Sequence, residues 1–368
     1  MLFFYKPLHN HKIEKLHHYN RYFFIGLFTF EPKFVHSRLL IHPDFEEIYT
    51  SYKTTIKDHL ENIHKVYIAL SSHDKELVKN AFYNNQLIED ICKCSINPVS
   101  YSELPKEINN LLEEYLTNLW SLLTTKDAKK NIKLKEQCGN IYEHYCDLFK
   151  DKRQIFTVCP VCGIEELLEE YDSCNDENEE NQTKAREAYD HYLPKSLYPF
   201  MSISFENLIP ICHHCNSDYK HKYNTPYDGS HRQKCFFPYS SGNNSIQVNI
   251  QSEHILKALS SSNSWFIELN SPNDIQEEID SWDRIFQIKS RYKNRIKTKE
   301  ASWKQRLYTE YKHDSSSNTF TLDSFKIKMY RDIQLTDQSS AIVQKSYYDY
   351  FLNNLLPSYM AMEEEMNQ

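Results

Sequence analysis

Two pairs of cysteines in this sequence have the spacing of a metal site. Cys159 and Cys162 enclose two residues, and so do Cys212 and Cys215. This spacing lets both sulfur atoms of a pair reach one ion from a tight turn, and two such pairs complete a tetrahedral shell. A shell of four thiolates has no open position for water. The sequence therefore predicts a structural Zn²⁺ site at these four cysteines, in preference to four ordinary thiols.

A second set of polar residues lies between the cysteine pairs and just after them. Asp190 and His191 are adjacent, Asn207 follows, and Asn216 stands directly after the last cysteine of the second pair. Neutral imidazole accepts a proton near neutral pH, so His191 is the candidate general base. The carboxylate of Asp190 and the amide oxygen of Asn216 are hard ligands that suit Mg²⁺ or Mn²⁺. Hydrolysis of a phosphodiester requires this combination of an activated water and a cation.

The order of these residues resembles that of the HNH endonucleases. The likeness covers residues 159–220 and rests on Asp-His-x-x-Pro at 190–194, Asn-Leu-Ile-Pro at 207–210 and Cys-x-x-Cys-Asn-x-x-x-Lys at 212–220. It implies a zinc-stapled ββα-metal core that cleaves DNA. It also implies that Asn207 pins an irregular hairpin by hydrogen bonds from its side chain to the backbone. Many members have histidine where this chain has Asn216, so His221 is the alternative metal ligand.

Two further expectations concern the geometry of this module. Neighbouring residues on a strand point to opposite faces, so Asp190 and His191 can serve one site only if their strand bends or ends there. Lys195 and Lys220 are candidate phosphate contacts, and the alternative is that both are ordinary solvated lysines.

Composition favours a mainly α protein with one small α+β module. The chain has 368 residues, of which 40% are hydrophobic and only 5 are glycine, so a fold with many tight turns is disfavoured. We expect a helical N-terminal region at 1–150, the nuclease module at 151–240 and a helical C-terminal region at 241–368. No apolar run approaches the ~18–20 residues of a membrane span. The expected location is the cytoplasm, where cysteines are reduced or bound to metal.

Hydrophobic periodicity places the helices that surround the module. Apolar residues recur every three or four positions at 56–70, 77–91, 108–123, 132–149, 285–307 and 347–355. Phe23, Gly26, Phe28 and Phe30 instead alternate, which indicates a strand near the N-terminus. We interpret the helical stripes as packing faces.

Charge is distributed unevenly along the chain. The formal net charge is −8, but residues 284–312 hold ten lysines and arginines against two glutamates. This basic helix is either simply solvated or a face that follows phosphates. The candidate contacts on it are Lys289, Arg291, Lys293, Arg295 and Lys297. Residues 165–180 carry nine acidic side chains and no basic one, which indicates a solvated loop or a flap that repels DNA.

The sequence leaves several functional alternatives open. A zinc-containing module that only binds nucleic acid or a partner would have the same cysteines, although the complete polar set argues against it. An RNA-directed nuclease would use the same metal and base, because both act on the phosphate. The motifs at 190–194, 207–210 and 212–220 and the basic helix that follows them are similar to those of bacterial phage-defence nucleases. These include nucleases paired with an ATPase in Septu-like systems. The resemblance therefore implies double-stranded DNA as the substrate and an ATPase as a partner.

Overall fold

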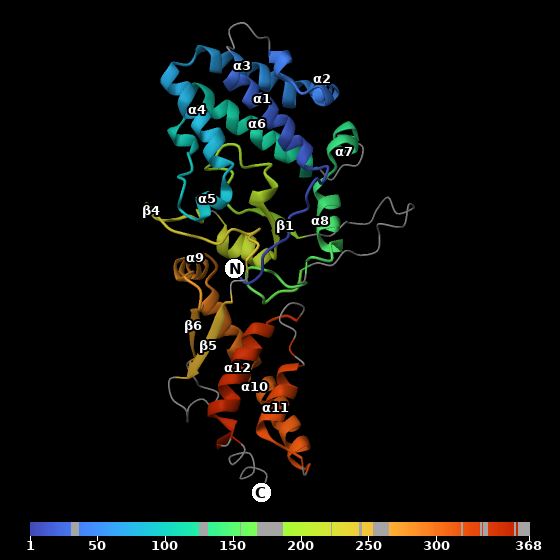
Figure 1. The fold of residues 1–368 in the computed structure, drawn as a ribbon, viewed down its shortest axis with the longest axis vertical. Helices are drawn as coiled ribbons and strands as arrows, with labels where there is room; N and C mark the ends of the chain where they lie inside the picture. Colours follow the sequence, from blue (N-terminus) through green and yellow to red (C-terminus); the bar gives the residue numbers. More distant parts are fainter. Residues whose placement is uncertain are drawn as a thin grey trace.

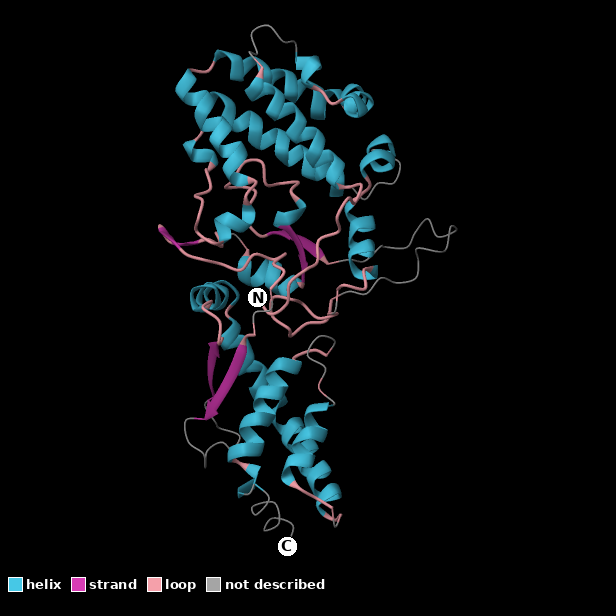
Figure 2. Cartoon of the chain, viewed as in Figure 1, coloured by secondary structure: helices cyan, strands magenta, loops and turns pink. Residues whose placement is uncertain are grey.

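The computed structural model is mainly helical and elongated, with the strands confined to its middle and lower parts (Figures 1 and 2). The N-terminal helices form one end, the two-stranded sheet of β1 and β2 lies near the middle, and the C-terminal helices form the other end (Figure 1). The structure describes residues 1–30, 37–124, 132–154, 156–167, 187–221, 223–242, 245–252, 265–317, 319–331, 333, 338–356 and 358–359. Most of the acidic stretch, residues 168–180, lies outside this set.

The N-terminal region is built from helices joined by short turns. The helices are α1 (Glu14–Thr29), α2 (Glu46–Ser51), α3 (Asp58–Ala69), α4 (Ser72–Asn85), α5 (Ile88–Cys92), α6 (Lys106–Thr124), α7 (Ile132–Cys138) and α8 (Ile141–Lys150). The turns between them include η1 (Ser37–Leu40), η2 (Pro43–Phe45), η3 (Lys53–Lys57) and η4 (Tyr101–Glu103).

The strand that the sequence predicts near residues 23–30 is wrong. Residues 23–29 lie in the second half of α1, Phe30 is its C-cap, and Phe23, Phe24 and Leu27 are buried on one face of the helix. Their spacing of three and four residues follows the helical period, and it outweighs the alternation that the phenylalanines share with a strand. Gly26 lets α1 pack closely, since a Cβ there would lie 3.1 Å from a methyl carbon of Leu40.

The single helix expected over 132–149 is divided into α7 and α8. Gly139 adopts a φ of +69°, a conformation that favours glycine and ends a helix. Asn140 then caps α8, because its side chain accepts hydrogen bonds from the backbone N–H groups of Tyr142 and Glu143. The two residues give the chain a new direction before it enters the middle module.

The middle module contains two antiparallel strands followed by a helical turn. Its elements are β1 (Ala188–His191), η6 (Phe205–Asn207), β2 (Leu208–Ile211), the π-helical η7 (His214–Lys220), β3 (Tyr227–Asp228) and β4 (His231–Arg232). The register of β1 and β2 pairs Asp190 with Ile209 and His191 with Leu208. Because β1 ends at His191, Asp190 and His191 stand at the point where the chain leaves the strand.

The described residues of the C-terminal region form one hairpin and four helices. Its elements are β5 (Gln247–Ser252), β6 (Trp265–Asn270), α9 (Gln276–Phe286), α10 (Ile288–Ser315), α11 (Leu322–Arg331) and α12 (Ala341–Asn354). The long helix expected from Ile285 is interrupted at Gln287, whose φ of +50° separates α9 from α10. None of the helices described is long and apolar enough to cross a membrane.

Two hydrophobic cores meet at the β1–β2 hairpin. Tyr189 and Leu208 belong to the core of the N-terminal helices, whereas Ile209 and Ile211 belong to the core that continues into the C-terminal region. The hairpin is therefore held from both sides, and its position depends on both flanking regions.

His144 on α8 makes stability depend on pH. The residue is buried, its Nδ1 lies 2.6 Å from the hydroxyl of Tyr189, and burial lowers its pKa to about 3. Between that value and the ordinary value near 6.5, the unfolded chain binds a proton that the folded chain does not, so stability falls as the pH falls. We predict that His144→Asn reduces the loss of unfolding free energy between pH 7 and pH 5 by about 2 kcal/mol.

Denaturant titrations at the two pH values measure this difference. His73→Asn, at an exposed position of α4, is the control and should keep the pH dependence of the parent chain. The same pH dependence in all three proteins would contradict a buried neutral imidazole at position 144.

Candidate metal centre and active site

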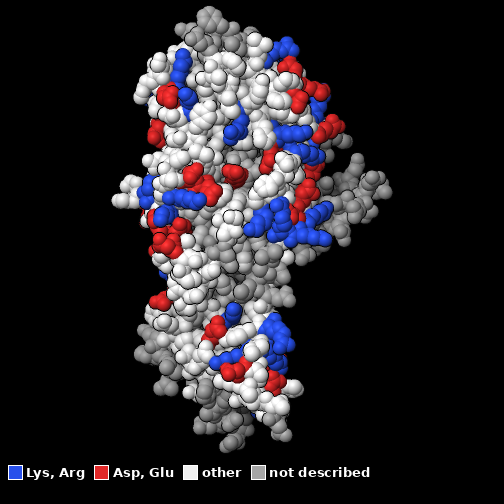
Figure 3. Space-filling view, viewed as in Figure 1, with Lys and Arg blue, Asp and Glu red and all other residues white. Residues whose placement is uncertain are grey.

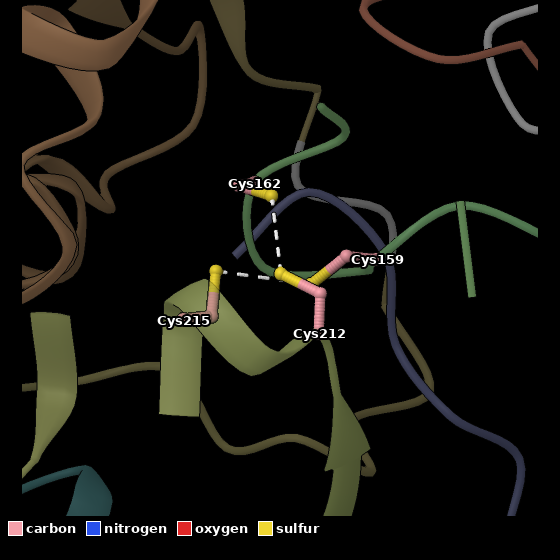
Figure 4. Close-up of side chains that lie close together, drawn as sticks. All are labelled: Cys159, Cys162, Cys212 and Cys215. Atoms are coloured by element: carbon pink, nitrogen blue, oxygen red, sulfur yellow. Dashed lines mark hydrogen bonds between the residues drawn. The ribbon is translucent and has the colours of Figure 1, made fainter. Parts of the chain in front are cut away.

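The four cysteines of the two pairs converge on one point. Their sulfur atoms all lie within 4.8 Å of one another, and all four residues are buried. The Cys159–Cys215 and Cys162–Cys212 sulfur distances are 3.8 and 3.9 Å. Sulfur atoms bound tetrahedrally to one ion at 2.3 Å would be separated by about 3.8 Å. The cluster therefore could hold a metal ion, and Figure 4 shows the four side chains directed toward a common centre.

Local sequence explains the geometry of the first cysteine pair. Cys159 and Cys162 lie on a turn in which the N–H of Gly163 donates to the carbonyl of Cys159 at 2.8 Å, and the N–H of Ile164 donates to the sulfur of Cys162 at 3.4 Å. Gly163 has a φ of +62°, and a Cβ there would lie 2.7 Å from a methyl carbon of Leu2. Both observations require glycine at this position.

Residues from distant parts of the chain hold this turn by hydrogen bonds to its carbonyl groups. Trp282 of α9 donates to the carbonyl of Val161 at 2.9 Å, and Tyr292 of α10 donates to that of Cys162 at 2.9 Å. The N–H of Leu2 donates to the carbonyl of Pro160 at 2.8 Å. The N–H of Ser340 donates to that of Gly163, also at 2.8 Å.

Arg291 belongs to the cysteine cluster and not to a DNA-facing surface. Its side chain is buried, its Nη1 lies 3.2 Å from the sulfur of Cys215, and its guanidinium lies 4.3 Å from the ring centre of Tyr219. A divalent ion with four thiolates carries a net charge of about −2, and a buried guanidinium offsets part of it. The prediction that Arg291 contacts phosphates is therefore wrong.

The remaining basic candidates of α10 differ in their exposure. Arg295 is partly buried, with Nη2 3.5 Å from the carbonyl of Ile164 and 3.6 Å from a carboxylate oxygen of Glu165. Lys289 is partly exposed and lies 3.6 Å from Asp283, while Lys293 and Lys297 are exposed.

A pocket of about 180 Å³ contains the candidate catalytic residues. It is lined by residues of β1, of the loop that follows and of η7. These residues are Tyr189, Asp190, His191, Pro194, Lys195, Ser196, Asn216, Lys220 and His221. The structure thus brings together His191, both candidate metal ligands and the alternative ligand His221.

His191 is held by its ring nitrogen and by an aromatic neighbour. Nε2 lies 2.9 Å from the carbonyl oxygen of Ser202, which can only accept a hydrogen bond, so Nε2 carries the hydrogen and Nδ1 is left to accept a proton. The ring of Trp120 on α6 meets the imidazole edge to face, with centres 4.6 Å apart. Burial lowers the pKa of His191 to about 3, which keeps the ring neutral.

Asp190 is paired with a lysine through one oxygen. Lys220 donates from Nζ to Oδ1 of Asp190 at 3.0 Å and to the carbonyl of His191 at 2.8 Å. Oδ2 is buried and has no hydrogen-bond partner among the described residues. Lys220 is itself 1% exposed and lines the pocket, so its predicted role as a phosphate contact stays a prediction beside its observed contact with Asp190. The lysine orients the carboxylate and leaves one oxygen toward a further ligand.

Asn207 and Lys195 complete the surroundings of the site. The Oδ1 of Asn207 accepts from the N–H of Leu193 at 2.7 Å, and its Nδ2 donates to the carbonyls of Leu193 at 2.9 Å and Met201 at 3.3 Å. These bonds tie the loop after β1 to the start of β2. Burial lowers the pKa of Lys195, an effect partly opposed by Glu113 of α6.

Comparison of the chain with protein families, with curated proteins and with solved structures gives no match in any of the three.

Three residues that contact the cysteine cluster or His191 were not assigned to these sites by the sequence analysis. Trp120 and Ser202 contact His191 from outside the motif strings, and Arg291 was one cation among ten in a basic segment. Arg291 lies three residues after the buried Ile288, so the two share a face of the helix, and this spacing could have marked Arg291 as partly inward-facing.

We predict that Arg291→Leu weakens metal retention by the cysteine cluster. The parent chain, purified without added metal, should contain one zinc per chain by elemental analysis. Without the guanidinium, the negative charge of the zinc–thiolate cluster is less well compensated. Release of zinc to a chelator should therefore be on the order of tenfold faster than in the parent chain. The control is Lys297→Leu on the exposed side of the same helix. Folded parent protein without zinc would contradict the metal assignment, and equal release rates would contradict the role of Arg291.

Proposed function

We propose that this chain is a metal-dependent endonuclease of the HNH type that hydrolyses phosphodiester bonds of DNA. The observation that supports it most is the pocket in which Asp190, His191 and Asn216 meet, with Nδ1 of His191 available as an acceptor. The order of two antiparallel strands and a helical turn, with the cysteine pairs around them, agrees with the ββα arrangement that the motif strings imply.

We propose different metals for the two sites. Four buried thiolates with no water position suit a structural Zn²⁺. The pocket offers oxygen ligands instead, namely the unpaired Oδ2 of Asp190 and the side chain of Asn216, which suit Mg²⁺ or Mn²⁺. A divalent cation bound there would neutralise charge on the phosphate and polarise a water.

The residues of the pocket have distinct roles in the proposed reaction. Nδ1 of His191 takes a proton from the attacking water, while the bond from Nε2 to Ser202 keeps that tautomer. Asn207 fixes the loop that follows His191. Lys195 lines the pocket as a partly buried cation that can bind a phosphate oxygen.

Substrate and biological setting follow from the resemblance. Double-stranded DNA, a role in bacterial anti-phage defence and an ATPase partner are proposed on the motif strings alone. RNA is the alternative substrate, since the proposed metal and base act on the phosphate, which DNA and RNA share.

We predict that His191→Ala abolishes cleavage and leaves the fold, zinc content and nucleic-acid binding intact. Removal of a general base costs about 10²- to 10⁴-fold in rate. Asn216→Ala removes a proposed metal ligand, so raising Mn²⁺ should restore part of its activity but none of that of His191→Ala. Duplex DNA, single-stranded DNA and RNA incubated with Mg²⁺ or Mn²⁺ provide the assay.

The two variants also separate the alternatives. Near-parental cleavage by His191→Ala would refute the mechanism. Equal losses without metal dependence would indicate misassigned ligands, with His221→Ala the next variant. If the parent chain binds nucleic acid but cleaves none, a non-catalytic module would be favoured. If it cleaves RNA alone, RNA would replace DNA as the substrate of the proposed enzyme.

Exposed lysines of α10 support binding to a polyanion. Acidic and basic side chains are interleaved over the N-terminal end in the view of Figure 3, so attraction to nucleic acid must be local. We predict that combined Lys289→Gln, Lys293→Gln and Lys297→Gln reduces the slope of log affinity against log salt by up to about 2.7, which is about 0.9 for each lost contact.

Salt titrations of duplex binding measure this slope. The matched control replaces the exposed Lys53, Lys65 and Lys106 of the N-terminal region by glutamine and should leave the slope unchanged. Equal slopes in the α10 variant and the parent chain would mean that these lysines are only solvated.

A further inference from the structure

Helix α6 reaches the candidate base through two contacts that lie one helical turn apart. The carbonyl of Leu116 accepts a hydrogen bond from the Oγ of Ser202 at 2.9 Å. Four residues later, Trp120 meets the ring of His191 with centres 4.6 Å apart and planes inclined by 75°. Residues four apart share a face of a helix, so a single face of α6 makes both contacts.

The two contacts restrict different motions of the imidazole. A rotation of the ring by half a turn about the Cβ–Cγ bond would bring Cδ2 to the place of Nδ1 and Cε1 to the place of Nε2, so that neither nitrogen would remain where it is needed. The carbonyl of Ser202 opposes this rotation only while it stays in place, and the bond from its own hydroxyl to Leu116 holds it there. The ring of Trp120 occupies the side of the imidazole and limits its tilt.

We propose that α6 fixes the tautomer and orientation of His191 through two positioning residues, Trp120 of α6 itself and Ser202 of the motif-bearing module, which α6 holds by the bond to Leu116. The proposal rests on the proposed function, because orientation matters for rate only if His191 is the base. It makes the N-terminal helical region part of the active site, since α6 is packed into that region's core through Leu112, Leu116 and Leu119.

The bond from Ser202 to Leu116 also stabilises the packing of α6 against the segment between β1 and β2. Ser202 is almost fully buried, and its hydroxyl would be left without a partner if α6 moved away. An unpaired buried hydroxyl is unfavourable, so the structure favours the arrangement in which α6 and the segment that bears Ser202 stay in contact.

The test measures the tautomer of His191 directly. Protein labelled with ¹⁵N at histidine gives ring-nitrogen spectra that distinguish the two neutral tautomers, and the signal that disappears in His191→Gln assigns the residue. We expect the Nε2–H form alone in the parent chain. Trp120→Leu and Ser202→Ala should each show the second tautomer or exchange between the two. Trp120→Phe, which keeps an aromatic ring, should restore the parental spectrum.

Cleavage kinetics give a second, independent result. Trp120→Leu should lower kcat on the order of tenfold or more with little change in KM, and Trp120→Phe should recover most of it. Thr117→Ala, at an exposed position of α6, is the control and should match the parent chain in both measurements.

Two outcomes overturn the proposal. One is an unchanged His191 tautomer in both Trp120→Leu and Ser202→Ala, and the other is a rise in KM with kcat unaffected. If the parent chain cleaves no nucleic acid, the proposed function fails, and the spectra still decide whether α6 positions the ring.

Discussion

The cluster of four buried cysteines is the constraint on which the remaining structure depends. Sulfur atoms within 4.8 Å of one another repel when ionised, and a bound cation turns that repulsion into a cross-link between the turn at 159–164 and the segment around η7. The carbonyl groups of that turn accept hydrogen bonds from the N-terminal segment, from α9, from α10 and from residue 340. A small turn thus joins parts of the chain that are more than three hundred residues apart, and Arg291 compensates its charge from the same side.

Two residues of the candidate active site depend on this cross-link, because Asn216 and Lys220 lie on η7, the same element that carries Cys215. η7 begins two residues after Cys212 and carries both Asn216 and Lys220, so the position of the cysteines sets where the amide and the ammonium point. The hairpin that supplies Asp190 and His191 lies between two cores, with Leu208 in one and Ile209 in the other. A module of this size buries too little apolar surface to be rigid alone, and the flanking helices supply the additional apolar packing surface.

Local patterns predicted more of this protein than distant contacts did. The cysteine spacing and the adjacent Asp190 and His191 are short-range signals, and the convergence of the four cysteines is confirmed. The strand predicted at 23–30 was wrong because large apolar residues occur in helices and strands alike. The secondary structure there depends on the core against which these residues pack. Lys220, Arg291 and Trp120 could not be assigned from sequence, because their partners are 30, 76 and 71 residues away in the chain.

Helix α10 connects the metal site with the proposed nucleic-acid surface. Its Tyr292 and Arg291 contact the cysteine-bearing segments, while Lys293 and Lys297 face solvent. Both sets occupy one rigid helix, so phosphates bound along its outer face would be fixed relative to the cross-linked module and, through η7, to the pocket. This arrangement would let a chain with a net charge of −8 bind a polyanion locally, as proposed. The basic segment thus contains buried cations that contact the cysteine cluster and exposed cations that are candidates for phosphate binding, and burial, more than charge, distinguishes the two groups.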